Sequence, residues 1–202
     1  MDVIQSLVVG FAVGLTGAMA PGPMLVATIE HSIREGWLAG PKVVMGHATL
    51  EMGIFILIVY GVYSLVQQWI SEIGLLGGVM MCFFGVLTIR SALGVFSSEK
   101  SVFMSPYAAG AFTSASNPYF WLWWLTVGLA LIMLGLPSIL AALTFMVGHL
   151  LADFSWYAAV ALTFSRTKRF ISDGLYRGVL GMCGIFLIGF GLWFVYSSRQ
   201  LL

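Results

Sequence analysis

The chain of 202 residues carries few charges, and its formal net charge at neutral pH is +1. Hydrophobic residues make up 60% of the sequence and charged residues 8%, with a mean hydropathy of +1.00. A water-soluble domain needs a far more polar surface, so the composition excludes one and indicates an integral membrane protein. The scattered basic residues also exclude nucleic acid as a partner.

Six apolar runs are long enough to span a bilayer, whose hydrocarbon core requires about 20 residues of α-helix. They are Val3–Ile29, Val43–Val66, Trp69–Leu93, Ser105–Leu134, Pro137–Phe164 and Leu175–Ser197. A cleaved signal peptide has basic residues before its apolar run, whereas the first run here is preceded by Asp2 and by no Lys or Arg. We therefore expect this run to stay in the mature protein. The sequence therefore predicts an all-α integral membrane protein with six transmembrane helices in a single transmembrane domain, residues 1–202.

Basic residues are distributed unequally between the two faces that these six spans define. The odd-numbered loops hold or adjoin eight Lys and Arg residues, and the other face has only Arg199. The eight are Arg34, Lys42, Arg90, Lys100, Arg166, Lys168, Arg169 and Arg177. Because cytoplasmic loops accumulate positive charge, we expect these loops in the cytoplasm and both the N-terminus and the C-terminus outside.

The two halves of the chain resemble each other. Three residues reappear 102 positions later: Gly46, His47 and Glu51 as Gly148, His149 and Asp153. At looser offsets, Pro21-Gly22-Pro23 corresponds to Asn117-Pro118, and Gly78 with Cys82 to Gly178 with Cys183. Because each half has three spans, the halves enter the membrane from opposite sides, which is the 3+3 inverted repeat of secondary transporters. Repeat 1 covers about residues 1–95 and repeat 2 about residues 105–200.

Two groups of helix-breaking residues lie inside apolar runs. Pro21, Gly22 and Pro23 interrupt the first run, because proline removes a helix hydrogen bond and clashes with the preceding turn. Asn117 and Pro118 interrupt the fourth run. In hydrocarbon, irregular backbone persists where it packs on protein or lines a wet cavity. The breaks are therefore candidate substrate or ion sites, with a simple kink or a helix cap as the alternative.

Acidic residues occur inside two predicted spans, each four residues after a histidine. His47 and Glu51 share one helix face, and so do His149 and Asp153. Acids inside a span are costly and by default mark a proton relay or a solute path, with a structural clamp between helices as the alternative. If the two pairs meet, their imidazoles and carboxylates would also form a four-ligand site for zinc or another divalent cation.

An aromatic block follows the second break. Its members are Tyr119, Phe120, Trp121, Trp123 and Trp124. Such clusters most often form a belt at the membrane–water interface, and this is our expectation here. A wall around a cationic group is the alternative.

Several segments form a pattern that extends over nearly the whole chain. The most specific are Gly17–Pro23 and, in the fourth run, Gly110–Thr113 with Asn117-Pro118. Others are Arg34–Gly40, Gly46–Glu51, and Asp153 with Trp156-Tyr157. Together these segments resemble the LysE/RhtB family of amino-acid exporters. The resemblance implies a multi-pass exporter in the cell (plasma) membrane that moves amino acids or related small metabolites outward, driven by a proton or cation gradient.

Three departures from the family pattern leave the solute open. Glu51 stands where the family usually has Asp, Met24 where it commonly has Asn, and neither His47 nor His149 is typical of it. Export of a divalent metal cation, with the two histidines, Glu51 and Asp153 as ligands, is the alternative function, because distant relatives in the same superfamily carry such ions.

The residues expected to bind solute or ion are Pro21, Gly22, Pro23, His47, Glu51, Asn117, Pro118, His149 and Asp153. We predict no enzyme activity and no cofactor, because the chain has neither an ATP-binding motif nor a nucleophile beside a base. The expected partners are the solute, a coupling proton or cation, and membrane lipids, with a homo-oligomer left open.

Overall fold

The computed structural model describes residues 2–61, 70–93, 104–135, 138–167 and 173–199, and over these residues it is all-helical. The helices are α1 (Val3–Ala18), α2 (Pro23–Glu35), α3 (Ala39–Val59), α5 (Ile70–Ala92), α6 (Pro106–Ala115), α7 (Pro118–Trp123), the π-helical turn η1 (Trp124–Gly128), α8 (Leu129–Gly135), α9 (Ile139–Thr167) and α10 (Asp173–Arg199). The all-α prediction is confirmed for this part of the chain. Three of the basic loop residues, Lys100, Lys168 and Arg169, lie outside it.

Within the described residues, two helices are each long and apolar enough to cross a bilayer, namely α3 with 21 residues and α9 with 29. The pair α1 and α2 also qualifies, although the chain bends by 81° between them. That makes two spans, or three if the bent pair counts as one. The six predicted spans therefore remain a prediction.

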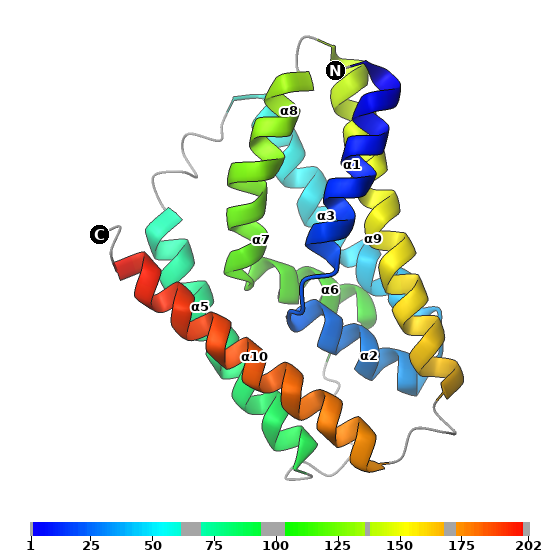
Figure 1. The fold of residues 1–202 in the computed structure, drawn as a ribbon, viewed down its shortest axis with the longest axis vertical. Helices are drawn as coiled ribbons and strands as arrows, with labels where there is room; N and C mark the ends of the chain where they lie inside the picture. The colour runs from blue at the N-terminus through cyan, green and yellow to red at the C-terminus, as the bar shows by residue number, and fades with distance from the viewer. Residues whose placement is uncertain (1, 62–69, 94–103, 136–137, 168–172, 200–202) are drawn as a thin grey trace.

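The first predicted break is confirmed. α1 ends at Ala18, and α2 begins at Pro23 with Gly22 as its N-cap. Proline suits the first position of a helix, where the missing N–H would have had no partner in the helix. As a result α2 lies across the direction of α1 and α9 (Figure 1).

The second predicted break is confirmed as well. α6 ends at Ala115, and Asn117 caps α7, with its side-chain oxygen accepting from the N–H of Tyr119 at 3.1 Å. The π-helical turn then carries the chain from α7 into α8. At each break, therefore, a new helix begins inside the bundle. α2 packs there against α9, α6 and α3, and α7 against α5.

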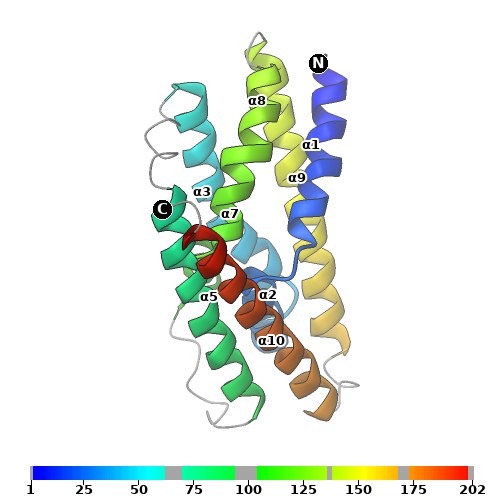
Figure 2. The same cartoon turned by 60° about the vertical axis from the view of Figure 1, so that its left-hand side comes forward.

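Helices from the two halves of the chain pack closely on each other. α1 lies along α9, and α3 along α6 (Figures 1 and 2). At four glycines in these contacts an added Cβ would overlap a carbonyl oxygen of the facing helix. The glycines and their facing residues are Gly10 with Phe145, Gly148 with Leu7, Gly46 with Tyr107 and Gly110 with Val43. Small residues are what allow this backbone-to-backbone approach in a membrane helix pair.

α5 and α10 form a second unit, crossing each other beside the rest of the bundle (Figure 2). Their close approach occurs where Gly78 faces Gly191 and where Gly85 faces Gly184. Among the described residues, nothing lies within 4 Å of a Cβ at Gly178, whereas Gly78 has close neighbours on α10. The glycines that allow close approach of α5 and α10 are therefore those at the point where the two helices cross.

The belt expectation is wrong for three residues of the aromatic block. Phe120, Trp123 and Trp124 are buried, with Trp124 only 1% exposed, and they pack in a core with Phe55 and Phe145. After the second break, Phe120 packs on His47 of α3, and Trp123 and Trp124 pack on His149 of α9.

Gly46→Ala should lower the free energy of unfolding by about 1–3 kcal/mol, because the new methyl group would push α3 away from the Tyr107 carbonyl of α6. Gly53→Ala in the same helix is the control, since nothing lies within 4 Å of its Cβ and alanine is the better helix former. Thermal unfolding of the detergent-solubilised proteins measures both. Equal melting temperatures for the two variants would contradict this packing.

Candidate functional site

A cavity lies between the two helix breaks and the middle of α3 and α9. Its empty volume is about 520 Å³, a figure that includes space open to solvent. The first break contributes residues between Gly17 and Met24, and the second contributes residues between Ser114 and Trp124. The remaining walls are His47 and Glu51 on α3 and three residues of α9. The cavity is thus built from both halves of the chain.

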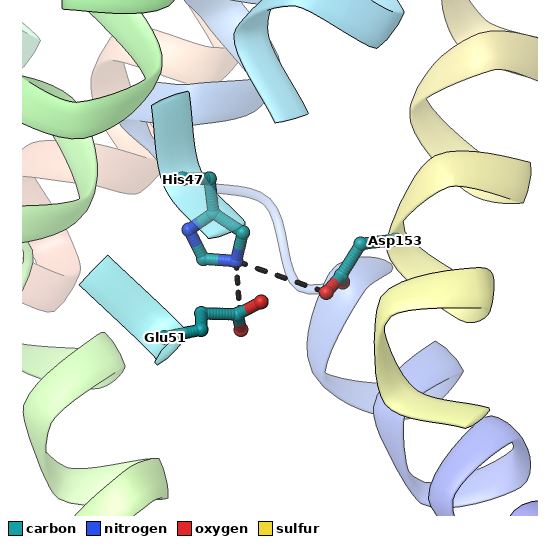
Figure 3. Close-up of side chains that lie close together, drawn as sticks. All are labelled: His47, Glu51 and Asp153. Atoms are coloured by element: carbon teal, nitrogen blue, oxygen red, sulfur yellow. Dashed lines mark ion pairs between the residues drawn. The ribbon is translucent and has the colours of Figure 1, made fainter. Parts of the chain in front are cut away.

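The two histidine–acid pairs meet in this cavity around one oxygen of Glu51. Glu51 Oε1 lies 3.0 Å from His47 Nε2 and 2.8 Å from His149 Nε2. Asp153 Oδ2 lies 3.8 Å from His47 Nε2 and 3.4 Å from His149 Nε2. Figure 3 shows the part of this cluster formed by His47, Glu51 and Asp153, with α3 on one side and α9 on the other. Contacts within and between the helices have similar lengths, so the four groups form one cluster.

His47 extends this cluster toward the second break. Its Nδ1 lies 2.7 Å from the hydroxyl oxygen of Ser114, and that hydroxyl donates to the Gly110 carbonyl at 2.8 Å. With the hydroxyl hydrogen used in this way, Nδ1 is assigned as the donor to Ser114. A hydrogen must then also lie between His47 Nε2 and Glu51 Oε1, since both atoms would otherwise present lone pairs. The network therefore holds exchangeable hydrogens at short N···O contacts.

Aromatic rings fix the orientation of both imidazoles. The ring of His149 lies 4.7 Å from Trp123 and 5.0 Å from Trp124, measured between centroids. Phe120 meets the His47 ring edge-on at 5.4 Å. Trp124 also donates its indole N–H to Glu51 Oε1 at 3.2 Å. These buried rings pack around both imidazoles and keep their Nε2 atoms directed at the carboxylate of Glu51.

Several buried polar atoms of the cluster make no hydrogen bond with any residue that the structure describes. They are Glu51 Oε2, His149 Nδ1 and Asp153 Oδ2. A buried polar atom without a partner costs about 1–3 kcal/mol, and more if it is charged. A cluster that served only to clamp helices together would gain by satisfying these atoms. The open acceptors instead favour a site that receives a proton, a cation or a donor group of a solute.

The donor set also fits a divalent cation. His47, Glu51 and Asp153 bring their ligand atoms within 4.8 Å of one another, and His149 Nε2 lies near the same two oxygens. A tetrahedral zinc ion with bonds of about 2.0–2.2 Å separates its ligands by about 3.3–3.6 Å. The contacts of 2.8–3.8 Å in this cluster bracket that spacing.

The structure brings most of the predicted site residues together. Six of the nine line the cavity: Gly22, His47, Glu51, Asn117, His149 and Asp153. Pro21 and Pro23 do not line it; Pro21 is exposed, and Pro23 is the buried first residue of α2. Pro118 begins α7 in the same way. These prolines shape the breaks, while the residues beside them face the cavity.

Sequence reasoning missed other residues of the cavity wall, including Met24 and Tyr157. Tyr157 had a readable signal, because it lies four residues after Asp153 and therefore on the same helix face. Trp123 and Trp124 also line the cavity; the sequence placed them in the aromatic block, for which a wall around a cationic group was the alternative to the expected belt.

Comparison with known proteins gives a family and one relative. The family model described as LysE type translocator matches residues 15–198. The chain is 27% identical, over the full length of both chains, to a protein of Bacillus subtilis (strain 168) named "Putative amino acid efflux protein YcgF". No solved structure gave a significant match.

A double-mutant cycle on Glu51→Gln and His149→Phe should give a coupling of at least about 1 kcal/mol in the free energy of unfolding, because the two side chains form one buried contact. Phenylalanine preserves the ring packing among the tryptophans. Unfolding in detergent measures the cycle. The control cycle replaces Glu51→Gln by Thr49→Ala, which is exposed and bonds only to its own helix, and should show no coupling. Additive effects in both cycles would contradict the cluster.

Proposed function

Because the chain belongs to the LysE type translocator family, we propose that it exports amino acids or related small metabolites by secondary transport, driven by a proton or cation gradient. Family membership makes the chain a membrane transporter and not an enzyme. The relative named as an amino acid efflux protein supports the choice of solute. We place the transporter in the plasma membrane as a multi-pass protein.

One observation carries this proposal. Two acids and two imidazoles, each at most 9% exposed, meet in a cavity near the middle of helices α3 and α9, which are long enough to cross a bilayer. Acids at membrane depth are expensive and are found where protons or solutes pass. In secondary transporters the solute site lies near the midplane, beside interrupted helices. Both features coincide in this cavity.

Architecture completes the proposal: six spans in a 3+3 inverted repeat, with both termini outside. The glycine contacts support the repeat, because Gly10 facing Phe145 and Gly110 facing Val43 are the same contact shifted by 100 residues on one side and 102 on the other. Helices α3 and α9 run in opposite directions along the bundle, as inverted halves require (Figure 1). The excess of basic residues in the predicted odd-numbered loops supports the orientation.

The cluster provides a route for the coupling ion. Glu51 Oε1 and Asp153 Oδ2 both lie near the Nε2 atoms of His47 and His149. A proton can therefore transfer between a carboxylate and an imidazole across N···O distances of at most 3.8 Å. In this proposal Glu51 and Asp153 take up and release the proton, or bind the coupling cation. The solute occupies the cavity between the two breaks.

Glu51→Gln and Asp153→Asn should each reduce gradient-driven amino-acid accumulation to the level of empty liposomes, because an amide cannot take up the coupling proton. The measurement uses purified protein in liposomes, a labelled amino-acid panel and an imposed pH gradient, with an internal pH dye reporting proton flux. Thr163→Ala is the matched control on α9, since Thr163 is exposed and its hydroxyl donates to the Ala159 carbonyl of its own helix. Proton-coupled accumulation that survives in both variants would rule out this role.

Export of a divalent metal cation is a second candidate, and it is favoured by the donor set of His47, Glu51 and Asp153 with His149 beside it. In this case His47→Ala should weaken zinc binding at least about tenfold. Loss of a residue that only hydrogen-bonds to a metal ligand already weakens binding by about that factor, so loss of a ligand itself should cost no less. Calorimetric titration of the purified protein with zinc, manganese and cadmium measures the affinity, and metal-sensitive dyes inside liposomes measure the flux. Metal flux without amino-acid flux would replace the amino-acid proposal, while zinc affinity unchanged in His47→Ala would remove the metal candidate.

A further inference from the structure

The helix that begins at the first break has its N-terminus open to the cavity. α2 has 13 residues, and no side chain caps its N-cap, Gly22. Pro23 has no N–H, and the N–H groups of Leu25 and Val26 point at the Gly22 carbonyl. The N–H of Met24 is therefore the first-turn donor left for a ligand, and both Gly22 and Met24 line the cavity. Such a helix end attracts negative charge.

Asn117, from the second break, adds amide donors at the same place. Its side-chain oxygen is used in capping α7, where it accepts from the N–H of Tyr119. This assigns the other amide atom as Nδ2, which would lie 3.5 Å from a Cβ built on Gly22. The N–H groups of Asn117 therefore stand beside the beginning of α2, and the two breaks together form one group of donors.

Gly22 is not required by the backbone or by packing. Its φ of −152° and ψ of −179° are extended values that any residue adopts. An added Cβ would make only ordinary van der Waals contacts, at 3.5 Å to Asn117 Nδ2 and 3.9 Å to the Ala20 carbonyl. This sets Gly22 apart from the interhelical glycines such as Gly10, where a Cβ would overlap a facing carbonyl. What the missing side chain leaves open is the space beside the donors.

The lining of the same cavity also has the complementary chemistry. Among the described residues, Glu51 Oε2 and Asp153 Oδ2 accept no hydrogen bond, although Asp153 Oδ2 lies 3.4 Å from His149 Nε2, and both side chains are at most 3% exposed. A line of contacts joins the two walls: Met24 Sδ lies 3.8 Å from the Ser114 hydroxyl, which lies 2.7 Å from His47 of the acidic cluster. One cavity is therefore lined both by these donors and by two buried carboxylates with acceptor atoms to spare.

We propose that Gly22, the N–H of Met24 and the Asn117 amide form a carboxylate-binding site, while Glu51 and Asp153 face the ammonium group of the same solute. This inference rests on the proposed function and deepens it. The exporter then selects zwitterions with a free carboxylate, and it discriminates against the amides and the decarboxylated amines of the same compounds. Gly22 and Asn117 are the residues that determine this specificity.

The test is competition during exchange in liposomes. Each labelled amino acid that the wild-type protein exchanges is competed by itself, by its amide and by its decarboxylated amine. We expect the amide and the amine to need at least about tenfold higher concentrations for half inhibition, because a hydrogen-bonded charge is lost at the donor wall. Equal competition by acid and amide would overturn the carboxylate site and leave the proposed function standing. The absence of any amino-acid exchange would overturn both.

Variants at Asn117 separate binding from folding. Asn117→Asp and Asn117→Ser both keep an oxygen that can cap α7, but both lose the amide donors. The half-saturating concentration should rise at least about tenfold in Asn117→Asp, where a negative charge faces the carboxylate, and by less in Asn117→Ser and Gly22→Ala. Ser116→Ala is the control, since Ser116 bonds only within α6. Unchanged affinity in Asn117→Asp, with an unchanged melting temperature, would overturn the site.

Discussion

The contact between Glu51 and three nitrogen atoms is the interaction on which the interior depends. His47, His149 and Trp124 all direct a ring nitrogen at the same carboxylate oxygen, at 2.8–3.2 Å. These side chains belong to α3, α9 and the π-helical turn, so a single acid links segments from both halves of the chain. In a bilayer the hydrophobic effect does not hold helices together, and polar contacts of this kind specify which faces meet.

The breaks and this cluster depend on each other. An interrupted helix exposes backbone donors and acceptors, which hydrocarbon cannot satisfy. Here the interrupted ends at Gly22 and Asn117 open on a cavity that the buried acids also line, and the polar groups face a shared space instead of lipid. The same arrangement provides the two walls of polar groups on which the proposed solute site rests.

Local chemistry made some features predictable from sequence. Proline next to glycine or asparagine fixed both helix breaks, and the four-residue spacing of each histidine and acid placed both on one helix face. That the pairs converge on Glu51 Oε1 could not be predicted, because it depends on how α3 packs against α9. Tertiary packing after the second break also buried Trp124, which composition alone would place in an interfacial belt. Sequence patterns thus predict the local structure and the chemistry of a side chain, whereas tertiary packing determines which residues that side chain contacts.

The glycine contacts between α1 and α9, and between α3 and α6, restrict how this molecule can change shape. A carbonyl oxygen pressed against a glycine has no side chain between the two backbones that could rotate to allow sliding. Each helix pair is therefore held as one closely packed unit. The two units meet through imidazoles, carboxylates and aromatic rings, which have rotatable bonds. Side chains are therefore freest to rearrange at the seam between the two units, which is where the cavity lies.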